Sequence, residues 1–488
     1  MVVFVVGAAS LGTEIAAARL LAPYFGASTI IWANTIATVL VALSVGYACG
    51  GRLADRRGDL AGLAGIVMSA AVLMAIVPFA ADPFLRLAAQ ALGSTSAGGF
   101  LGSLAAVLVL VAVPVVLLGA VAPYANRLGL GSVANAGTVT GGLYAISTAG
   151  SLVGTFLAAL LLIPLIGTHR TFLVFAAALA LVAAPFLRSR FVWLVPAVLA
   201  GALAIPPAAG SANVPGAKVV FAEETPYQYA RVLQFANGER WLQLNEGIAI
   251  HSLYRPGSFL TGGYWDDPLV LPGASARGEP RRMAILGDAA GTVARAYGHY
   301  LPSTRVDAVE LDGALTRIGQ RLFGLRGSNL HLYTADARPW LAGRRARYDT
   351  IFLDAYRQPY IPFYLVTREF FQLVRDHLRP GGALVINIGH IPGSDALEKT
   401  VTATLRTVFP WVLRDVVSDS NTLAMASLQP LRPARMPAAA PRGLGSLARS
   451  VKTRIWPPLR GGTVFTDDRA PVEWLTDLSI VHYAQSGR

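Results

Sequence analysis

The first 210 residues carry almost no charge, and this feature most limits what the chain can fold into. They hold nine basic and four acidic residues, whereas the rest of the 488-residue chain holds 32 Lys+Arg and 24 Asp+Glu. Crossing a hydrocarbon core takes about 20 apolar residues. The sequence therefore predicts a multi-pass α-helical membrane domain over 1–210, with about six or seven helices. Its candidate spans are 2–23, 29–51, 60–81, 100–123, 139–166, 170–187 and 190–207, of which the last two are the shortest.

Charges near these spans predict how the chain enters the membrane. The first span has no basic start and contains Glu14 and Arg19, so we expect a retained span and not a cleaved signal peptide. The loop "GGRLADRRGD" at 50–59 is the most basic early loop, which places the N-terminus inside. The loops at Arg127 and 188–190 then also fall inside. Seven crossings would leave the soluble part outside and an even number would leave it inside, so the count of spans decides its side.

Composition argues against several classes of function. Nucleic-acid binding needs clustered cations, but the arginines behind the net charge of +13 are scattered, apart from a run at 432–460. The Pro, Ala and Gly content of that run predicts a flexible basic loop over 429–460 that lies on anionic lipid. Cys49 is the single cysteine, and no His pair has ligand spacing. We therefore expect no nucleic-acid partner, no disulfide framework and no metal.

The soluble part predicts an α/β domain with a small β region before it. Over 218–275, apolar residues alternate on both sides of "NGE", which is typical of strands joined by a hairpin turn. Over 280–428, strand-like runs alternate with helical stretches, which predicts a Rossmann-type, mostly parallel sheet with right-handed crossovers. Residues 461–488 are expected to complete this domain. The strand-like runs are 282–286, 305–310, 329–334, 348–353 and 383–388.

Four motifs fall where such sheets bind their ligands, at the carboxyl ends of the strands. Gly287 and Gly291 form a turn before a helix N-terminus, where the backbone can approach a ligand. Glu310 is placed to accept hydrogen bonds from two ribose hydroxyls. Asp336 follows the third strand, where a carboxylate can bond an adenine amine, and Asp354 closes the fourth. Each acid alone can also be a helix cap, but four motifs in register favour a binding site.

At these residues the sequence resembles the spermidine synthase (polyamine aminopropyltransferase) family, a branch of the adenosylmethionine-methyltransferase fold. The matching pieces are "TPYQYARV", Tyr264 followed by "WDDPLVLP", "ILGDAAGT", "VELD", "TADAR" and "YDTIFLDAY". With "GTEIAAARLLAPYFGAS" and "GYACGGRLADRRGD", the chain resembles bacterial membrane proteins in which major-facilitator-like helices are fused to a spermidine synthase domain. Nearly the full length takes part in this resemblance.

The resemblance implies a reaction and a role for each residue. Asp354 would be the catalytic base that takes a proton from the attacking amine. Gln228 would contact methylthioadenosine and Glu310 its ribose, while Tyr264 would border the amine pocket. No cofactor would be tightly bound; decarboxylated S-adenosylmethionine would be the co-substrate, and putrescine or a similar small amine the acceptor. The implied substrate-binding residues are Gln228, Tyr264, Gly287, Asp288, Gly291, Glu310, Asp336, Ala337 and Tyr356, with adenine at Asp336 and Ala337.

Three departures from the family pattern keep other functions open. Ala290 stands where an acid usually holds the donor's amino end, with Asp288 two residues away. Trp265 replaces a histidine, and Arg357 replaces the second acid of an Asp-x-x-Asp element, where a cation repels a diammonium acceptor. The alternatives are a methyltransferase, and a transporter or sensor with a non-catalytic nucleoside-binding domain. We expect a multi-pass cell-membrane protein with a cytoplasmic soluble domain, because the adenosyl donor is made there; a homodimer stays open.

Overall fold

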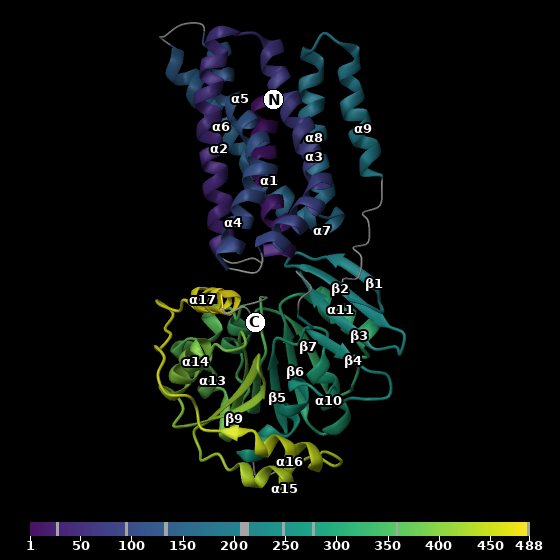
Figure 1. Cartoon of the computed structure of the whole chain (residues 1–488), viewed down its shortest axis with the longest axis vertical. Helices are drawn as coiled ribbons and strands as arrows, with labels where there is room; N and C mark the ends of the chain where they lie inside the picture. The colour runs from purple at the N-terminus through teal and green to yellow at the C-terminus, as the bar shows by residue number, and fades with distance from the viewer. Residues whose placement is uncertain are drawn as a thin grey trace. The chain divides into compact units, whose positions relative to one another are not determined.

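A computed structural model describes residues 1–25, 29–92, 96–130, 135–204, 214–245, 249–275, 279–357 and 360–485. The chain divides into two compact units (Figure 1). The helical unit comprises Met1–Gly210 and the short segment Glu224–Tyr229. The α/β unit comprises Ser211–Glu223 and Ala230–Arg488. The boundary near residue 210 lies where the apolar composition ends.

Long helices packed through small residues make up the helical unit. A side chain at Gly150 would lie 2.0 Å from the Phe4 carbonyl oxygen, and one at Gly154 would lie 2.0 Å from that of Ala8. Close approach of α1 and α6 therefore requires glycine at both positions. The helices are α1 (Val2–Phe25), α2 (Thr29–Arg56), α3 (Leu60–Leu92), α4 (Ser96–Val107), α5 (Val113–Gly129), α6 (Ala136–Phe156), α7 (Ile163–Ile166), α8 (Thr168–Ala183) and α9 (Leu194–Leu203).

Six helical stretches in the described part of the chain are long and apolar enough to cross a membrane. Within the described residues, the seventh candidate, expected at 190–207, is shorter than a span: a four-residue 3₁₀ turn leads into the ten residues of α9, and residues 205–207 lie outside the described part. Together they reach about 23 Å, against a hydrocarbon core of about 30 Å. The six stretches are Val2–Leu21, Trp32–Arg56, Leu60–Ala81, Gly102–Gly129, Ala136–Leu162 and Thr168–Phe186.

The small β region is a four-stranded sheet in the order β1-β2-β3-β4. Its strands are β1 (Ala217–Glu224), β2 (Tyr229–Phe235), β3 (Arg240–Leu244) and β4 (Ser252–Tyr254). β2 and β3 are antiparallel, with Ala230 opposite Leu244. This pairing confirms the hairpin predicted around "NGE".

The main sheet has eight strands in the order β12-β10-β11-β9-β8-β5-β6-β7. The five predicted strands are its parallel part, β5 (Arg282–Leu286), β6 (Arg305–Glu310), β7 (Leu330–Thr334), β8 (Tyr348–Leu353) and β9 (Leu378–Gly389). β11 (Asn421–Ser427), β10 (Trp411–Ser418) and β12 (Ile455–Trp456) add an antiparallel edge that was not predicted. Both faces of β5 and β8 are buried, because Leu286 and Leu353 pack into one core while Ile285 and Phe352 pack into the other. Strands buried on both faces read as continuous apolar runs.

Helices follow the strands of the main sheet, as expected for crossovers. They are α10 (Thr292–Tyr300), α11 (Gly313–Ile318), α12 (Ala337–Ala342), α13 (Arg368–Asp376) and α14 (Ala396–Arg406), with α17 (Val472–Gln485) near the end of the chain. A π-helical turn at Gly319–Phe323 extends α11. The helical stretches "LTRIGQRLFGL" and "TREFFQLVRDHL" therefore form where the sequence predicts them.

The basic segment at 432–460 is ordered structure, so the prediction of a flexible loop there is wrong. It forms α15 (Met436–Ala439), α16 (Gly445–Thr453) and β12 (Figure 1). Leu444, Ala448 and Val451 are buried against the main core, and β12 pairs with β10. These three positions recur at spacings of four and three residues, which places them on one face of a helix. The surrounding Pro, Gly and Arg residues concealed that pattern.

Candidate active site

Backbone hydrogen bonds bring three of the four predicted motifs to one place at the carboxyl edge of the main sheet. The N–H of Gly287, after β5, donates to the Val309 carbonyl oxygen of β6 at 2.9 Å. On the other side, the Asp354 N–H donates to the Leu286 carbonyl oxygen at 2.9 Å. The glycine turn therefore lies between Glu310, the last residue of β6, and Asp354, which follows β8.

The turn after β5 requires glycine at both of its predicted positions. Gly287 has φ +89°, and a side chain there would lie 2.5 Å from the Ala355 Cα. Gly291 has φ +87°, and a side chain there would lie 2.5 Å from the Leu325 Cδ1. β4 supports the turn, since Ser252 Oγ accepts the Ala290 N–H at 2.9 Å. The result is a close backbone turn at the N-terminus of α10, as the sequence predicts.

Glu310 is held by backbone donors from this turn and from its own strand end. Its Oε2 accepts the Ala289 N–H at 2.8 Å, and its Oε1 accepts the Asp312 N–H at 2.9 Å. Burial raises the pKa of Glu310, while these N–H groups lower it in part. Each carboxylate oxygen still has a second lone pair. Glu310 can therefore accept further hydrogen bonds from a ligand.

Asp288 is a buried acid with an unsatisfied oxygen. The residue is only 8% exposed, and its Oδ1 has no hydrogen-bond partner within the described part of the chain. Burial, then the charge of Glu310, raises the pKa of Asp288 well above its ordinary value, and the charge of Asp354 adds to this. A buried acceptor without a donor costs free energy. This oxygen is available to a donor from a ligand.

Asp354 is oriented by two neutral donors. Its Oδ2 accepts from the Tyr264 hydroxyl at 3.1 Å, and its Oδ1 accepts from Asn387 Nδ2 at 2.8 Å. Burial raises the pKa of Asp354 to about 7; the hydrogen bonds from Asn387 and Tyr264 lower it in part, and the charge of Glu310 raises it. A carboxyl group with this pKa exchanges a proton near neutral pH, as a general base must.

Asn387 is a site residue that sequence reasoning missed. It lies in β9 and is almost fully buried. The Tyr356 hydroxyl donates to the backbone carbonyl oxygen of Asn387 at 3.0 Å and accepts the Gly389 N–H at 2.6 Å. Tyr356, predicted to bind substrate, thus also braces the strand that carries Asn387. A single polar residue inside the apolar run "ALVINIG" was the signal that could have found it.

Asp336 acts as a helix cap in this structure. Its Oδ1 accepts the Arg338 N–H at 3.0 Å at the start of α12, and its Oδ2 accepts the Tyr364 hydroxyl at 2.8 Å. Ala337 is the first residue of that helix and is buried. Asp336 follows β7, beside Glu310, because the Ala335 N–H donates to the Glu310 carbonyl oxygen at 3.0 Å. The cap and a nucleoside contact are compatible, since the carboxylate keeps spare lone pairs.

The other predicted positions are distributed differently. Gln228 lies in the segment Glu224–Tyr229, which belongs to the helical unit. The structure therefore does not place Gln228 with Glu310 and Asp354. Trp265 stacks on Tyr264 with ring centroids 4.4 Å apart, which gives the replaced histidine position a packing role. Arg357 is exposed, and its charge lowers the pKa of the partly buried Tyr364 hydroxyl, against the larger raising effect of burial.

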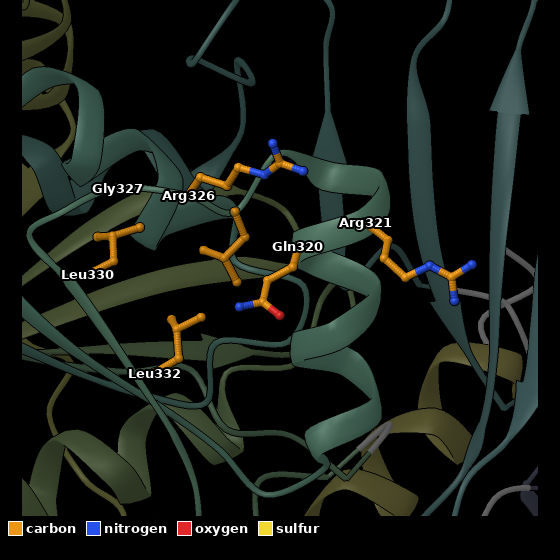
Figure 2. A pocket seen from close by; sticks show the side chains of 7 residues that line it. Gln320, Arg321, Arg326, Gly327, Leu330 and Leu332 are labelled. Carbon is orange, nitrogen blue, oxygen red and sulfur yellow. The ribbon is translucent and has the colours of Figure 1, made fainter.

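A pocket of about 340 Å³ lies behind the glycine turn and does not contain the carboxylates. Figure 2 shows Gln320 and Leu332 facing it, with the Arg321 guanidinium on the far side of the helix. Leu325, which lines this pocket, is also the residue against Gly291. The pocket is therefore separate from the candidate site. Its lining is Gln320, Arg321, Leu325, Arg326, Gly327, Leu330 and Leu332.

Comparison with known proteins agrees with the resemblance seen in the sequence. A probable polyamine aminopropyl transferase of Bifidobacterium longum is 30% identical over 275 residues, covering 52% of this chain and 61% of that protein. A polyamine aminopropyltransferase of Vibrio vulnificus is 34% identical over 145 residues, covering 29% of this chain and 48% of that protein. The α/β unit is therefore similar to polyamine aminopropyltransferases over part of their length.

This similarity covers part of each relative. The chain spans 61% and 48% of the length of these two aminopropyltransferases. The crystal structure of a probable spermidine synthase from Corynebacterium glutamicum aligns with a TM-score of 0.41 and 20% identity, covering 53% of this chain and 99% of that one. No family model matches the chain.

Proposed function

We propose that the chain is a membrane-bound aminopropyltransferase of the spermidine synthase type. In this proposal the α/β unit transfers an aminopropyl group from decarboxylated S-adenosylmethionine to putrescine or a similar amine. Similarity to polyamine aminopropyltransferases supports the reaction class, and six apolar stretches long enough to span support attachment to a membrane. The observation that carries the proposal is the charge of the site.

The site is built for a cationic ligand. Asp288 is buried, and Glu310 and Asp354 are partly buried. The charges of Glu310 and Asp354 raise the pKa of Asp288, and the charge of Glu310 raises that of Asp354. Within the described part of the chain, the hydrogen-bond and ion-pair partners of these three carboxylates include no Lys, Arg or His. Buried acids without a cation are unfavourable unless a ligand supplies the charge. Decarboxylated S-adenosylmethionine carries two positive charges, on the sulfonium and on the propylammonium group.

The same argument separates the two adenosyl donors. S-adenosylmethionine has an additional carboxylate, which would have to lie near buried acids of like charge. At 4 Å, an effective dielectric constant of 20 gives a repulsion of about 4 kcal/mol between two unit charges. We therefore infer that Asp288 takes the ammonium end of the decarboxylated donor, in the role that an acid at position 290 has in the family. This assignment gives the unsatisfied Asp288 oxygen a donor.

The reaction follows from the arrangement around Asp354. The protonated acceptor amine first gives a proton to the Asp354 carboxylate. The neutral amine then attacks the methylene carbon bonded to sulfur; the carbon–nitrogen bond forms as the carbon–sulfur bond breaks, and the electron pair goes to sulfur. The products are methylthioadenosine and a protonated secondary amine, and the Asp354 carboxyl group passes its proton to water. Tyr264 and Asn387 hold that carboxylate by neutral hydrogen bonds. Its pKa of about 7 keeps it ionised often enough to accept the proton.

Calorimetry on the full chain in detergent tests the proposal. We expect decarboxylated S-adenosylmethionine to bind at least tenfold more tightly than S-adenosylmethionine, and methylthioadenosine to be released when putrescine is added. Preference for S-adenosylmethionine would favour a methyltransferase. Failure of both donors to bind would favour a transporter or sensor with a different ligand.

A further inference from the structure

The ordered basic segment at 432–460 contributes one residue, Arg454, that pairs with two buried acids. Arg454 follows α16 and extends its guanidinium to two buried carboxylates. Its Nη2 lies 2.6 Å from Asp267 Oδ2, and its Nε lies 3.0 Å from Asp415 Oδ1. The side chains of Asp267 and Asp415 are 3% and 0% exposed. Breaking a buried pair by removing one partner is strongly destabilising, so this bridge holds its elements firmly.

One of these carboxylates sits on the same short helix as Tyr264. The 3₁₀ helix η6 (Tyr264–Leu269) carries the tyrosine at its first position and Asp267 one turn later. A 3₁₀ helix has three residues per turn, so a shift or rotation of η6 at Asp267 also moves Tyr264. The Tyr264 hydroxyl donates to Asp354 at 3.1 Å, which is long for an O–H···O bond. A small displacement of η6 would therefore break it.

The remaining contacts of η6 restrain it at other points. Asp266 accepts the N–H groups of Thr261 and Gly262 at 2.8 and 2.7 Å, which fixes the loop before the helix. The Tyr297 hydroxyl donates to the Pro268 carbonyl oxygen at 2.8 Å, which fixes the end of the helix. Arg454 alone among these contacts comes from the segment after β11. It ties the helix to Asp415 of β10, on the antiparallel edge of the sheet.

We propose that Arg454 is a positioning residue for the candidate base. It holds η6 through Asp267 so that the Tyr264 hydroxyl stays hydrogen-bonded to Asp354. We call this contact of Arg454 with Asp267 the clamp. The hydrogen bond from Tyr264 lowers the pKa of Asp354, so losing the clamp, and with it this bond, should raise the pKa of Asp354. The inference rests on the proposed function, because Asp354 is taken there as the base.

The test is the pH profile of aminopropyl transfer by the full chain in Arg454→Gln, Tyr264→Phe and the double variant. Each single change should move the acidic limb of kcat/KM to higher pH and lower kcat about tenfold, as expected for one lost hydrogen bond. KM for the donor should stay unchanged, because Glu310 and Asp288 are untouched. The double variant should match Tyr264→Phe. The proposal would be overturned if the double variant lost kcat by the product of the two single losses. It would also be overturned if the acidic limb of kcat/KM in Arg454→Gln stayed at the wild-type pH.

Two further variants make the result specific. Arg449→Gln removes an exposed cation from α16, the helix that Arg454 follows. It should leave the acidic limb of kcat/KM and the value of kcat unchanged. Arg454→Lys keeps a charge that can reach one carboxylate, and should give an intermediate shift; it replaces Arg454→Gln if that variant does not fold. An effect of Arg449→Gln as large as that of Arg454→Gln would contradict the clamp.

A readout without catalysis separates this inference from the proposed function. Trp265 stacks on Tyr264, so its fluorescence, taken as the difference from Trp265→Phe, reports the position of η6. Arg454→Gln should change that signal and Arg449→Gln should not. A wild-type chain that binds no adenosyl donor would refute the proposed function, and the fluorescence would still decide the clamp. Unchanged Trp265 emission in Arg454→Gln would refute the clamp.

Discussion

Replacing Asp354 by Asn tests the chemistry most directly. The amide keeps the shape of the carboxylate but cannot take the proton of the attacking amine. One amide hydrogen would also face a donor, because Asp354 accepts from both Asn387 and Tyr264. A general base contributes about 10²- to 10⁴-fold to rate. We expect kcat to fall by that factor, while methylthioadenosine, which carries no transferable group, binds with nearly its wild-type affinity.

The pH dependence of the wild-type protein supplies the magnitude. The pKa of Asp354 in the free protein is about 7, so the ionised fraction is roughly one tenth at pH 6 and nine tenths at pH 8. The value of kcat/KM for the donor should therefore rise about tenfold between these two pH values. In the complex, the positive charges of the donor favour the carboxylate, so the corresponding limb of kcat should lie at lower pH.

The assay is release of radiolabelled methylthioadenosine from pH 5.5 to 9, with affinity for methylthioadenosine measured by calorimetry. Full transfer by Asp354→Asn would exclude this residue as the base. Residual activity with the same acidic limb as wild type would assign the titrating group elsewhere.

Three further predictions concern the nucleoside pocket, the acceptor and the membrane side of the α/β unit. Glu310→Gln should weaken methylthioadenosine binding tenfold or more by calorimetry, since hydrogen bonds to a charged group contribute about 1.5–3 kcal/mol each; an unchanged Kd would remove Glu310 from the site. Arg357→Asp should raise kcat/KM for putrescine by up to about tenfold, with Arg357→Gln between, because an exposed cation repels a diammonium acceptor; no change would place Arg357 outside the acceptor pocket. In a Cys49→Ser background, a cysteine at the exposed Ser328 should resist an impermeant maleimide in intact cells. One at Ser94, which lies outside the described residues, should react, and rapid labelling at 328 would put the α/β unit outside.

Apolar patterning predicted the parallel strands well because four of them, β5, β6, β8 and β9, are buried on both faces. β5 and β6 begin and end at the predicted residues, and β9 extends the predicted 383–388 to Leu378–Gly389. The antiparallel edge was missed because its strands look less uniform: β10 contains Arg414 and Asp415 within "WVLRDVVS". Asp415 is buried there because Arg454 pairs with it. A charge neutralised by a partner far along the chain cannot be recognised from local sequence.

The site was predicted in part for the same physical reason. Parallel strands bring their carboxyl ends to one edge, so Glu310, Asp354 and the glycine turn could be placed from strand order alone. Asp336 also fills the helix-cap role that the sequence left open. Asp354 accepts hydrogen bonds from Tyr264 and Asn387. The resemblance to a family motif pointed to Tyr264, whereas Asn387 lies in a strand of the apolar core and matched no motif. Orientation of a side chain by tertiary contacts leaves no local pattern.

The count of membrane spans bears on a conflict within the sequence itself. With seven crossings, the basic loops at 50–59, Arg127 and 188–190 place the α/β unit outside, away from a cytoplasmic donor. With six, the last of them Thr168–Phe186, the chain returns to the inner side at the loop that carries Arg188 and Arg190. The stretch Arg190–Leu203 is then a short apolar helix, too short to cross. With six crossings, charge bias and donor chemistry favour the same side, so a cytoplasmic α/β unit stays the prediction that the maleimide experiment tests.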